Sequence, residues 1–503
     1  MPRIDAPDVI VVGAGFGGLG AALTLAERGV SVTVLEALTV PGGCASTFRR
    51  GGHRFEAGAT LSAGFAAGQL FRAWIDRHGL AVDPVPLDPV VEMRTPDLRL
   101  AVPRDRSRFV ARLSALPGAP RARLAAFFAE QERVAGTLWG LLDDPDLLPP
   151  LGAGAVLRHV LAAPRYAALA RLAGKPLASV VLRHGLQDFA PLRTYLESAC
   201  QITVQCGVDE AEAPVALATA DYWFRGAAHL RGGIGTLAGA VADAVRRSGG
   251  DVRFATRVRG IERRAGRWRV VTTRGSLDAP VVVANVLPQS LCGLAGIARG
   301  EDAALDRLAT DVEGGWGAVM LYLVVRAPRD AAESAQHLDL VGDPSAPYVE
   351  GNHVFVSIGA DGDGAPSGCR TLTASTHVRA AALREMDDAG RAAHVHAIQE
   401  RMRALLDVKA PEWMHGVEHA MTASPRTFER FTLRPGGLVG GVPRRAGLRN
   451  YRGLAPQEVR PGLWLAGDSV FPGQSTLAAA IGGTRVAAAI VRSGRVAAHG
   501  AVA

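Results

Sequence analysis

The chain has 503 residues, of which 48% are hydrophobic, and a formal net charge of +8 at pH 7. This length exceeds one ordinary hydrophobic core and predicts two or more interleaved domains. The positive charge is almost all arginine, since lysine occurs only at positions 175 and 409. No basic run is interleaved with aromatic residues, which argues against a nucleic-acid partner. The five cysteines are widely spaced, so we expect free thiols, with no disulfide framework and no metal site.

The first predicted element is a strand that ends in a glycine-rich turn. Residues 9–12 are all Val or Ile, and residues 13–18 read GAGFGG. Gly13 lets the chain turn tightly, Gly15 lets the backbone approach a pyrophosphate, and Gly18 lets the next helix pack close to the strand. The turn therefore predicts the ADP half of a dinucleotide at this end of the chain.

An acidic residue follows the second apolar run. Residues 32–35 read VTVL and are followed by Glu36, where a carboxylate would bond the ribose hydroxyls of adenosine. Residues 8–36 thus predict the first strand–helix–strand half of a doubly wound sheet. The uncharged stretch 9–26 has the length of a membrane span, but five glycines interrupt it, so we expect an intracellular protein without an integral anchor.

The middle of the chain changes character twice. Residues 40–43 turn sharply, and a hairpin is expected over Phe48–Gly58. From about 85 to 225, proline-punctuated helical stretches such as Arg121–Leu142 and Tyr166–His184 predict a cap. Residues 232–236 then open a helix; the poor strand before them favours a packing or substrate-facing turn over a second nucleotide loop.

The remaining elements return to strands and helices. Strands are expected over Asp251–Thr256, Val258–Arg263, Trp268–Thr273 and Leu277–Asn285. Strand-like alternation then follows around Met320–Val325 and His353–Ile358, with a helix near Ala392–Leu406. The last sixty residues predict a strand, a turn and an alanine-rich helix that ends near Arg492.

Several motifs resemble the flavin amine oxidase and phytoene desaturase superfamily. Glu36, followed by PGG at 41–43 and by Thr47, resembles the second glycine motif of that superfamily. Residues 55–59 (FEAGA) resemble its Phe-Asp-x-Gly stretch, with Glu56 in place of the commoner Asp.

The C-terminal part carries the resemblance further. AGDS at 466–469 and FPGQ at 471–474 resemble the closing FAD motif of carotenoid desaturases and isomerases. GGLVGGVP at 436–443 is similar to that branch. The resemblance covers both ends of the chain and residues 230–290, and it is thin through the cap.

The resemblance implies FAD as the cofactor. Asp468 would accept hydrogen bonds from the ribityl chain or a flavin phosphate, and the helix that begins near Ser475 would direct its positive end at the flavin. Val258 would contact adenine through its backbone. The cofactor-binding residues implied in this way are Gly13, Gly15, Phe16, Gly17, Gly18, Glu36, Ala37, Gly42, Gly43, Thr47, Gly58, Ala59, Val258, Gly467, Asp468, Gln474, Ser475 and Thr476.

The same resemblance implies an α/β fold: an FAD-binding, Rossmann-like (GR2-type) doubly wound domain with an inserted α+β substrate domain. Residues 1–85, 230–300 and 440–503 would form the discontinuous FAD-binding domain. Residues 86–229 and 301–439 would form the substrate-binding cap.

The implied function is that of an FAD-dependent carotenoid oxidoreductase, foremost a carotenoid 3,4-desaturase acting on a hydroxylated carotenoid. A hydride would pass from the polyene to flavin N5 and extend the conjugation. The nearest alternative is a carotene cis–trans isomerase that uses reduced FAD, followed by another polyene or retinoid oxidoreductase. A flavin amine oxidase is disfavoured, because such enzymes often attach the flavin through a late cysteine and no cysteine follows Cys369 here. A flavin-free prenyl-binding chaperone is disfavoured by the intact glycine motif, Glu36 and Asp468.

The expected partners follow from this chemistry. A lipophilic carotenoid dissolves in the bilayer, so we expect a cytoplasmic enzyme in peripheral contact with the inner face of the cell membrane. Leu147–Ala178, which mixes leucine with arginine, suits either an interfacial patch or an ordinary cap helix. Oxygen or a quinone would reoxidise the flavin.

No catalytic residue is assigned by the sequence. Three histidines can each be interpreted either as a base or as a structural side chain, namely His229, His377 and His415. The aromatic residues Trp223, Phe224, Trp316 and Tyr322 are likewise read either as tunnel lining or as core.

Overall fold

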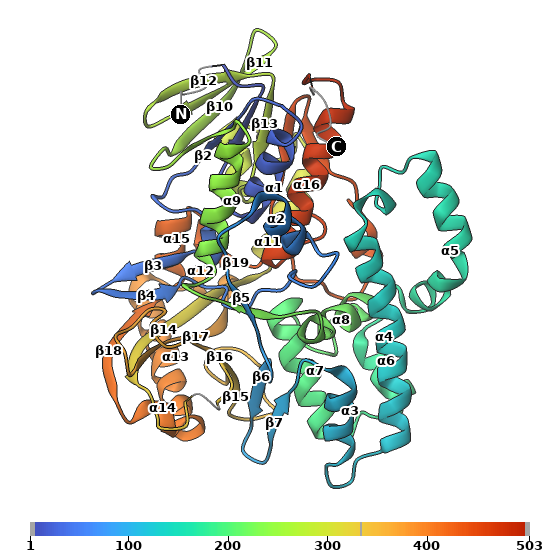
Figure 1. Cartoon of the computed structure of the whole chain (residues 1–503), viewed down its shortest axis with the longest axis vertical. Coiled ribbons are helices and arrows are strands. Elements are labelled where there is room, and N and C mark those ends of the chain that lie inside the picture. Colours follow the sequence, from blue (N-terminus) through green and yellow to red (C-terminus); the bar gives the residue numbers. More distant parts are fainter. Residues whose placement is uncertain (1–5, 332–333, 498–503) are drawn as a thin grey trace.

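The computed structural model describes residues 6–331 and 334–497. A six-stranded sheet lies in the upper half of the molecule in Figure 1, and all its neighbouring strands run parallel except the edge strand β20. In spatial order its strands are β20 (Gln457–Arg460), β21 (Leu463–Leu465), β13 (Val281–Ala284), β1 (Val9–Val12), β2 (Val32–Leu35) and β9 (Asp251–Arg253).

Both faces of this sheet are covered, which explains why β1 and β13 are apolar at every position. Val9 and Val11 of β1 pack among the helices α1 (Phe16–Ala26), α9 (Gly235–Arg247) and α16 (Thr476–Arg492). Ile10 and Val12 point to the other side. That side is covered by β10 (Val258–Arg264), β11 (Arg267–Thr272), β12 (Gly275–Ala279), α10 (Pro288–Ala295) and α11 (Ala303–Glu313).

The first and last helices of the fold pack backbone against backbone. A Cβ added at Gly20 would lie 2.5 Å from the carbonyl oxygen of Ala480, and one added at Gly483 would overlap the carbonyl oxygen of Gly17. Only glycine at these positions allows α1 and α16 to approach so closely. The two ends of the chain therefore form one structural unit, as the two separated motifs predict.

A second, eight-stranded sheet lies in the lower half of the molecule (Figure 1). One of its faces is aliphatic and packs against α13 (Asp388–Lys409) and α14 (Pro411–Met414). Its strands in order are β18 (Val417–Ala423), β14 (Trp316–Arg326), β17 (Cys369–Arg379), β16 (His353–Ile358), β15 (His337–Val341), β6 (Val91–Arg94) and β7 (Arg99–Val102), and β19 (Leu438–Val439) pairs with the start of β14.

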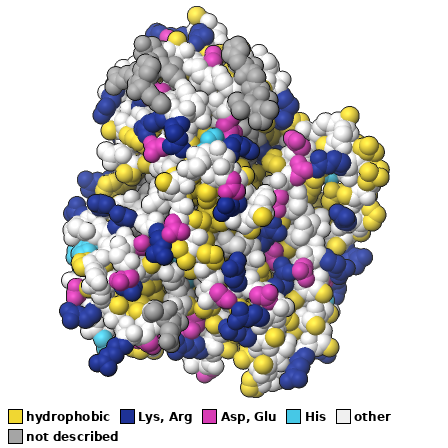
Figure 2. All heavy atoms as spheres, viewed as in Figure 1, with side chains coloured by type: hydrophobic (Ala, Val, Ile, Leu, Met, Phe, Trp, Pro, Cys, Tyr) yellow, Lys and Arg dark blue, Asp and Glu magenta, His cyan; other side chains and the backbone are white. Residues whose placement is uncertain are grey.

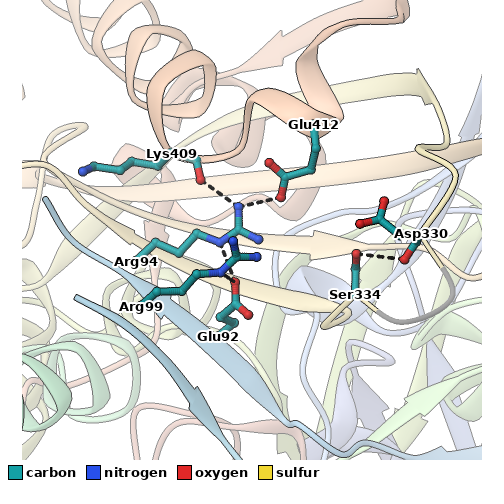
Figure 3. Close-up of polar contacts among 7 residues, drawn as sticks. All are labelled: Glu92, Arg94, Arg99, Asp330, Ser334, Lys409 and Glu412. Atoms are coloured by element: carbon teal, nitrogen blue, oxygen red, sulfur yellow. Dashed lines mark hydrogen bonds and ion pairs between the residues drawn. The ribbon is translucent and has the colours of Figure 1, made fainter. Parts of the chain in front are cut away.

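The β6–β7 hairpin corrects the expectation of purely helical stretches between residues 85 and 225. Its strands are short and rich in charge, and ion pairs hold them in the sheet (Figure 3). Arg94 contacts the carboxylates of Glu92 and Glu412, each at 2.6 Å, and its Nη1 donates to the carbonyl oxygen of Lys409 at 2.7 Å. Tertiary contacts with α13 and α14, absent from any local pattern, therefore decide the structure here.

The helical layer consists of α3 (Arg106–Ser114), α4 (Arg121–Asp143), α5 (Ala153–Leu172), α6 (Leu177–Arg183), α7 (Ala190–Thr203) and α8 (Ala213–Ala220). The helix expected over Tyr166–His184 is broken by residues 173–176, which include Gly174 and Pro176, so that it falls into α5 and α6. Within the described residues, no helix combines the length and the apolarity needed to cross a bilayer.

The remaining elements connect these layers. The hairpin expected over Phe48–Gly58 is confirmed as β3 (Thr47–Arg50) and β4 (His53–Glu56). The poor strand before Gly232 belongs to a separate two-stranded sheet, which agrees with the interpretation of Gly232–Thr236 as a packing turn. The other elements are α2 (Leu70–His78), β5 (Pro84–Pro86), β8 (Ala228–Leu230), α12 (Ala380–Arg384) and α15 (Pro425–Thr432). The boundaries proposed for the two domains stay a prediction.

Candidate functional site

A cavity of about 860 Å³ lies at the carboxyl ends of the parallel strands of the six-stranded sheet. Ligands of doubly wound folds bind at this edge of the sheet. The cavity extends to the polar face of the eight-stranded sheet and to α4, α5 and α8. Three layers of the fold therefore meet at one site.

The glycine turn after β1 forms one wall of the cavity. Gly13 has a φ of +95°, which an L side chain rarely adopts. Gly15 lines the cavity, and the nearest atom to a Cβ added at Gly43 is the Cα of Gly15, at 3.9 Å. The turns at Gly15 and Gly43 thus lie opposite each other, and the lack of side chains at these positions lets a ligand approach the backbone.

Glu36 lies at the end of β2 and lines the same cavity. Its Oε2 accepts a hydrogen bond from the backbone N–H of Ala14 at 2.7 Å, and its Oε1 accepts one from Leu38 at 2.8 Å. Burial raises the pKa of the Glu36 carboxyl, and these two hydrogen bonds oppose the rise. The carboxylate is thereby fixed at the strand end, with lone pairs left for ribose hydroxyls.

Asp468 follows β21 and lines the cavity beside the N-terminus of α16. Ser475 caps this helix, since its hydroxyl accepts from the N–H of Ala478 at 3.0 Å. Arg434 also lines the cavity and forms an ion pair with Asp468. Burial lowers the pKa of its guanidinium, but the neighbouring Asp468 and Cys44 raise it above its usual value. The carboxylate can accept hydrogen bonds from the hydroxyls of a ligand, and the helix N-terminus can stabilise partial negative charge on the same ligand.

The residues present fit FAD. The bare glycine backbone would accept the pyrophosphate, Glu36 the ribose, and Asp468 the ribityl hydroxyls. A further polar atom faces this site: Gln205 is 1% exposed, lines the cavity, and has a side-chain oxygen without a hydrogen-bond partner among the described residues. Its amide N–H donates to the carbonyl oxygen of Val439 at 2.9 Å.

The cavity brings together all but two of the predicted cofactor residues. Gly18 lies beneath the turn, where an added Cβ would overlap the carbonyl oxygen of Gly13, so its role is close helix packing. Thr47 donates to Glu56 at 2.8 Å and accepts from the N–H of Gly235 at 2.8 Å, both outside the lining. The lining includes Gly13, Gly15, Phe16, Gly17, Glu36, Ala37, Gly42, Gly43, Gly58, Ala59, Val258, Gly467, Asp468, Gln474, Ser475 and Thr476.

The candidate bases separate in the structure. Only His377 of the three named histidines lines the cavity. Nε2 of His229 forms a hydrogen bond with the carboxylate of Asp363 at 2.5 Å, and His415 is exposed after α14. The four aromatic residues weighed as tunnel lining lie outside it; of these, Trp223 is fully buried in the helical core.

Sequence reasoning singled out His377 but missed the rest of the polar face of the eight-stranded sheet. His353, Phe355, Ser375 and His377 line the cavity from this face, and Asp339 lies behind His353. The sequence does show the alternation that is typical of a strand with two different faces. Residues 353–356 read HVFV, and residues 375–378 read STHV. Other parts of the lining are apolar and come from Leu138, Trp139, Leu142, Leu148, Leu169, Val215 and Leu454.

Comparison with known sequences agrees with this geometry. Residues 16–491 match the family described as "Flavin containing amine oxidoreductase". The chain is 23% identical to prolycopene isomerase from Arabidopsis thaliana over 527 aligned positions, which cover 95% of this chain and 82% of that protein. It is 32% identical to phytoene dehydrogenase from Streptomyces griseus over 53% of this chain and 51% of that protein. A shorter match, 38% identical, covers 19% of this chain and 19% of the neurosporene-forming phytoene desaturase of Cereibacter sphaeroides.

Solved structures resemble the fold over nearly the whole chain. An oxidoreductase from Methanosarcina mazei is similar with a TM-score of 0.67 and 16% identity, over 96% of this chain and 99% of that one. Putrescine oxidase bound to putrescine is similar with a TM-score of 0.63 and 16% identity, over 98% and 100% of the two chains. The chain therefore belongs to the flavin containing amine oxidoreductase family, and it is an FAD-dependent oxidoreductase whose relatives include carotenoid desaturases and isomerases.

Proposed function

We propose that this enzyme is a carotenoid 3,4-desaturase that acts on a hydroxylated acyclic or monocyclic carotenoid. The observation that carries the proposal is that one cavity is lined both by most of the predicted FAD residues and by an apolar region of α4, α5 and α8, called here the apolar arm. The apolar arm consists of Leu138, Trp139, Leu142, Leu169 and Val215. A hydrocarbon chain in that arm would lie next to the cofactor site without crossing solvent. When bound, FAD supplies the two-electron oxidation that desaturation requires.

The residues of the cavity have distinct proposed roles toward the cofactor. The backbone of Gly13 and Gly15 would bind the pyrophosphate, and Glu36 would bind the adenosine ribose. Asp468 would orient the ribityl chain, and Val258 would contact adenine from the start of β10. The apolar side chains of the arm would align the polyene and exclude water.

A carotene cis–trans isomerase is the second candidate. Its support is the length of the match to prolycopene isomerase, which reaches 95% of this chain, whereas the match to phytoene dehydrogenase reaches 53%. We propose that the two activities differ in whether the polyene is oxidised overall, as it is in desaturation, or only isomerised. A desaturase would pass its electrons on to oxygen or a quinone, and an isomerase would not consume an acceptor.

Expression in hosts that accumulate single, defined carotenoids tests the proposal. A desaturase yields a product that has lost two hydrogens and absorbs at longer wavelength. A product of unchanged mass with a changed isomer composition supports the isomerase and rejects desaturation. The matched control is the Glu36→Gln variant, expressed in the same hosts and expected to lose FAD and both activities. Failure of the wild-type enzyme to change any polyene would overturn both candidates.

We also propose that α5 contacts the membrane from which the carotenoid is drawn. Val156, Leu157, Val160 and Leu161 of α5 are exposed, up to 75% for Leu161. They form an apolar surface over α5, visible at the right of Figure 2. The cavity is lined near both ends of α5, by Leu148 before the helix and by Leu169 in its last turn. A bilayer against α5 would therefore be next to the apolar arm.

A further inference from the structure

The side chain of Gln205 brings an unpaired polar atom to the cavity. Gln205 lies two residues after α7, is 1% exposed and lines the cavity. Its Nε2 donates to the carbonyl oxygen of Val439 at 2.9 Å, whereas its Oε1 has no hydrogen-bond partner among residues 6–331 and 334–497. The contact with Val439 fixes the orientation of the amide, because an oxygen in the place of Nε2 would repel that carbonyl. A buried acceptor without a donor costs free energy, which a ligand with a hydroxyl or an N–H would recover.

The backbone of Gln205 has a conformation that suits glycine better. Its φ is +60°, in the left-handed region. Its N–H donates to the carbonyl oxygen of Cys200 at 2.9 Å, and its own carbonyl oxygen accepts from Nε1 of Trp316 at 2.8 Å. The glutamine side chain is therefore kept at a position where glycine would be less strained, which is typical of a residue with a function.

Gln205 lies where the predicted FAD residues meet the apolar arm. Residues 202–205 line the cavity and continue from α7, which packs against α8 of the arm. Gln474, one of the predicted FAD residues, donates from Nε2 to the carbonyl oxygen of Ile202 at 2.6 Å. A Cβ added at Gly440 would overlap Nε2 of Gln205 and lie 2.6 Å from Oε1 of Gln474. The two amides therefore flank the bare Cα of Gly440 at the border between the cofactor residues and the arm.

The proposed reaction needs a polar contact at this border. In a 3,4-desaturation the oxidised bond lies near one end of the carotenoid, so a hydroxyl on that end is only a few bonds from the carbon that gives up its hydride. The hydroxyl must then lie beside the cofactor, while the rest of the polyene extends along the apolar arm. A hydroxyl donates one hydrogen bond, and an amide oxygen can accept it.

We propose that Oε1 of Gln205 accepts the hydrogen bond of the substrate hydroxyl and so selects hydroxylated carotenoids. This inference rests on the proposed desaturase function and names the residue that sets its substrate preference. A carotenoid without the hydroxyl would leave the amide oxygen buried and unpaired, which disfavours its turnover. The same hydrogen bond fixes the polyene along the arm, and with it the bond that lies beside the cofactor. Gln205 is a specificity-determining residue, since no bond to it forms or breaks.

Gln131 provides a matched control. It lies on α4 and is 1% exposed, its Nε2 donates to the carbonyl oxygen of Leu217 at 3.0 Å, and its Oε1 lacks a partner within the described part of the chain. It differs from Gln205 in lying outside the cavity lining. Substitution of either glutamine removes a buried amide, but only Gln205 faces the cavity.

The test compares Gln205→Met with Gln131→Met on a hydroxylated acyclic carotenoid and on the same chain without the hydroxyl. Wild type and Gln131→Met should prefer the hydroxylated carotenoid by the same ratio of kcat/KM. Gln205→Met should lower kcat/KM for the hydroxylated carotenoid about 10- to 100-fold and leave the value for the other carotenoid unchanged, because methionine has a similar length but no strong acceptor. Gln205→Gly, which suits the positive φ and so favours folding, should lose the preference in the same way.

An unchanged preference in both Gln205 variants, or an equal loss in Gln131→Met, would overturn the proposal. A preference that stays intact while Gln205→Met loses FAD would also overturn it, because the amide oxygen would then belong to the cofactor. FAD content and the flavin absorption spectrum of the purified proteins measure this.

Binding of the two carotenoids to the holoenzyme, measured by quenching of tryptophan fluorescence, separates this proposal from the proposed function. If the polyene is isomerised without oxidation, yet Gln205→Met loses the binding preference for the hydroxylated carotenoid, the desaturase assignment fails and the role of Gln205 stands. If the wild type desaturates both carotenoids equally well, the desaturase assignment stands and the role of Gln205 fails. A holoenzyme that binds neither carotenoid would overturn both.

Discussion

The guanidinium of Arg434 holds the carboxylate of Asp468 through two contacts, Nη2 to Oδ2 at 2.9 Å and Nη1 to Oδ1 at 3.3 Å. Arg434 follows α15, and Asp468 follows β21. The pair fixes the acidic residue at the cavity and compensates its charge, so the site does not repel an anionic ligand.

Asp468→Asn should weaken FAD binding about 10-fold, because the amide cannot accept ribityl hydrogen bonds as a carboxylate does. Fluorescence of flavin released during dialysis measures the dissociation constant. The control is Asp278→Asn, which removes the partner of Arg269 from another two-contact pair, at 2.9 and 2.8 Å, outside the cavity lining. Equal FAD affinity in Asp468→Asn and wild type would contradict the proposed role of Asp468.

Gly18→Ala should lower the free energy of unfolding by about 3 kcal/mol, because its Cβ would overlap the carbonyl oxygen of Gly13. Gly239→Ala on α9 has no heavy atom within 4 Å of the added Cβ and should stabilise the protein by about 0.5–1 kcal/mol through helix propensity. Urea unfolding of both variants checks the contrast. An unchanged free energy of unfolding in Gly18→Ala would mean that the turn after β1 can open without cost.

The pH dependence of stability should carry a contribution from Glu56. Burial raises the pKa of this carboxyl from about 4.5 to about 7. Between these values the folded protein keeps a proton that the unfolded chain releases, so stability falls as pH rises from 4.5 to 7 and levels off above. The expected loss is on the order of 1 to 3 kcal/mol.

The measurement for Glu56 is urea unfolding of wild type and Glu56→Gln at several pH values across this window. Glutamine does not titrate, so the difference in unfolding free energy between the two proteins should change with pH and become constant above pH 7. The neighbours Asp363 and His229 act on Glu56 in both directions, and they are unchanged in the variant. Parallel curves would show that Glu56 has its ordinary pKa.

The double variant Leu157→Asp, Leu161→Asp should lose most of its binding to phosphatidylcholine–phosphatidylglycerol vesicles, because two charges would enter the apolar surface of α5. Co-sedimentation measures the bound fraction, and a tenfold or greater drop is expected from roughly 3 kcal/mol of lost burial. Val408→Asp, which changes a residue 70% exposed on α13, is the control. Equal losses in both proteins would point to general solubility effects.

Local signals predicted the parts of the fold that depend on neighbours in sequence. The turn at Gly13, the hairpin of β3 and β4, and the helix α16 each follow from turn residues and periodicity within a short window. The turn and the start of α16 also hold predicted cavity residues, among them Gly13, Gly15 and Thr476, because a glycine turn and a helix start act through backbone that lies close in sequence.

The missed parts depend on residues that meet only in three dimensions. Arg94 makes β6 a strand through partners more than 300 positions away, Lys409 and Glu412. The polar face of the eight-stranded sheet draws on three strands, through Asp339, His353 and His377, and no window of the sequence contains all three. Alternation identified strands in this region but not which face would border a cavity, because that depends on the packing of the other face against α13.

The contact of α1 with α16 has a consequence for how the enzyme is made. A ribosome releases the glycine turn after β1 long before α16, because more than 400 residues separate them and synthesis proceeds at about 5–20 residues per second. Until α16 has emerged, the backbone face of α1 around Gly17 and Gly20 lacks the helix against which it packs, and the cavity lacks the residues of α16 that line it. We therefore expect cofactor loading to wait for α16, so that a chain interrupted before this helix should not retain FAD.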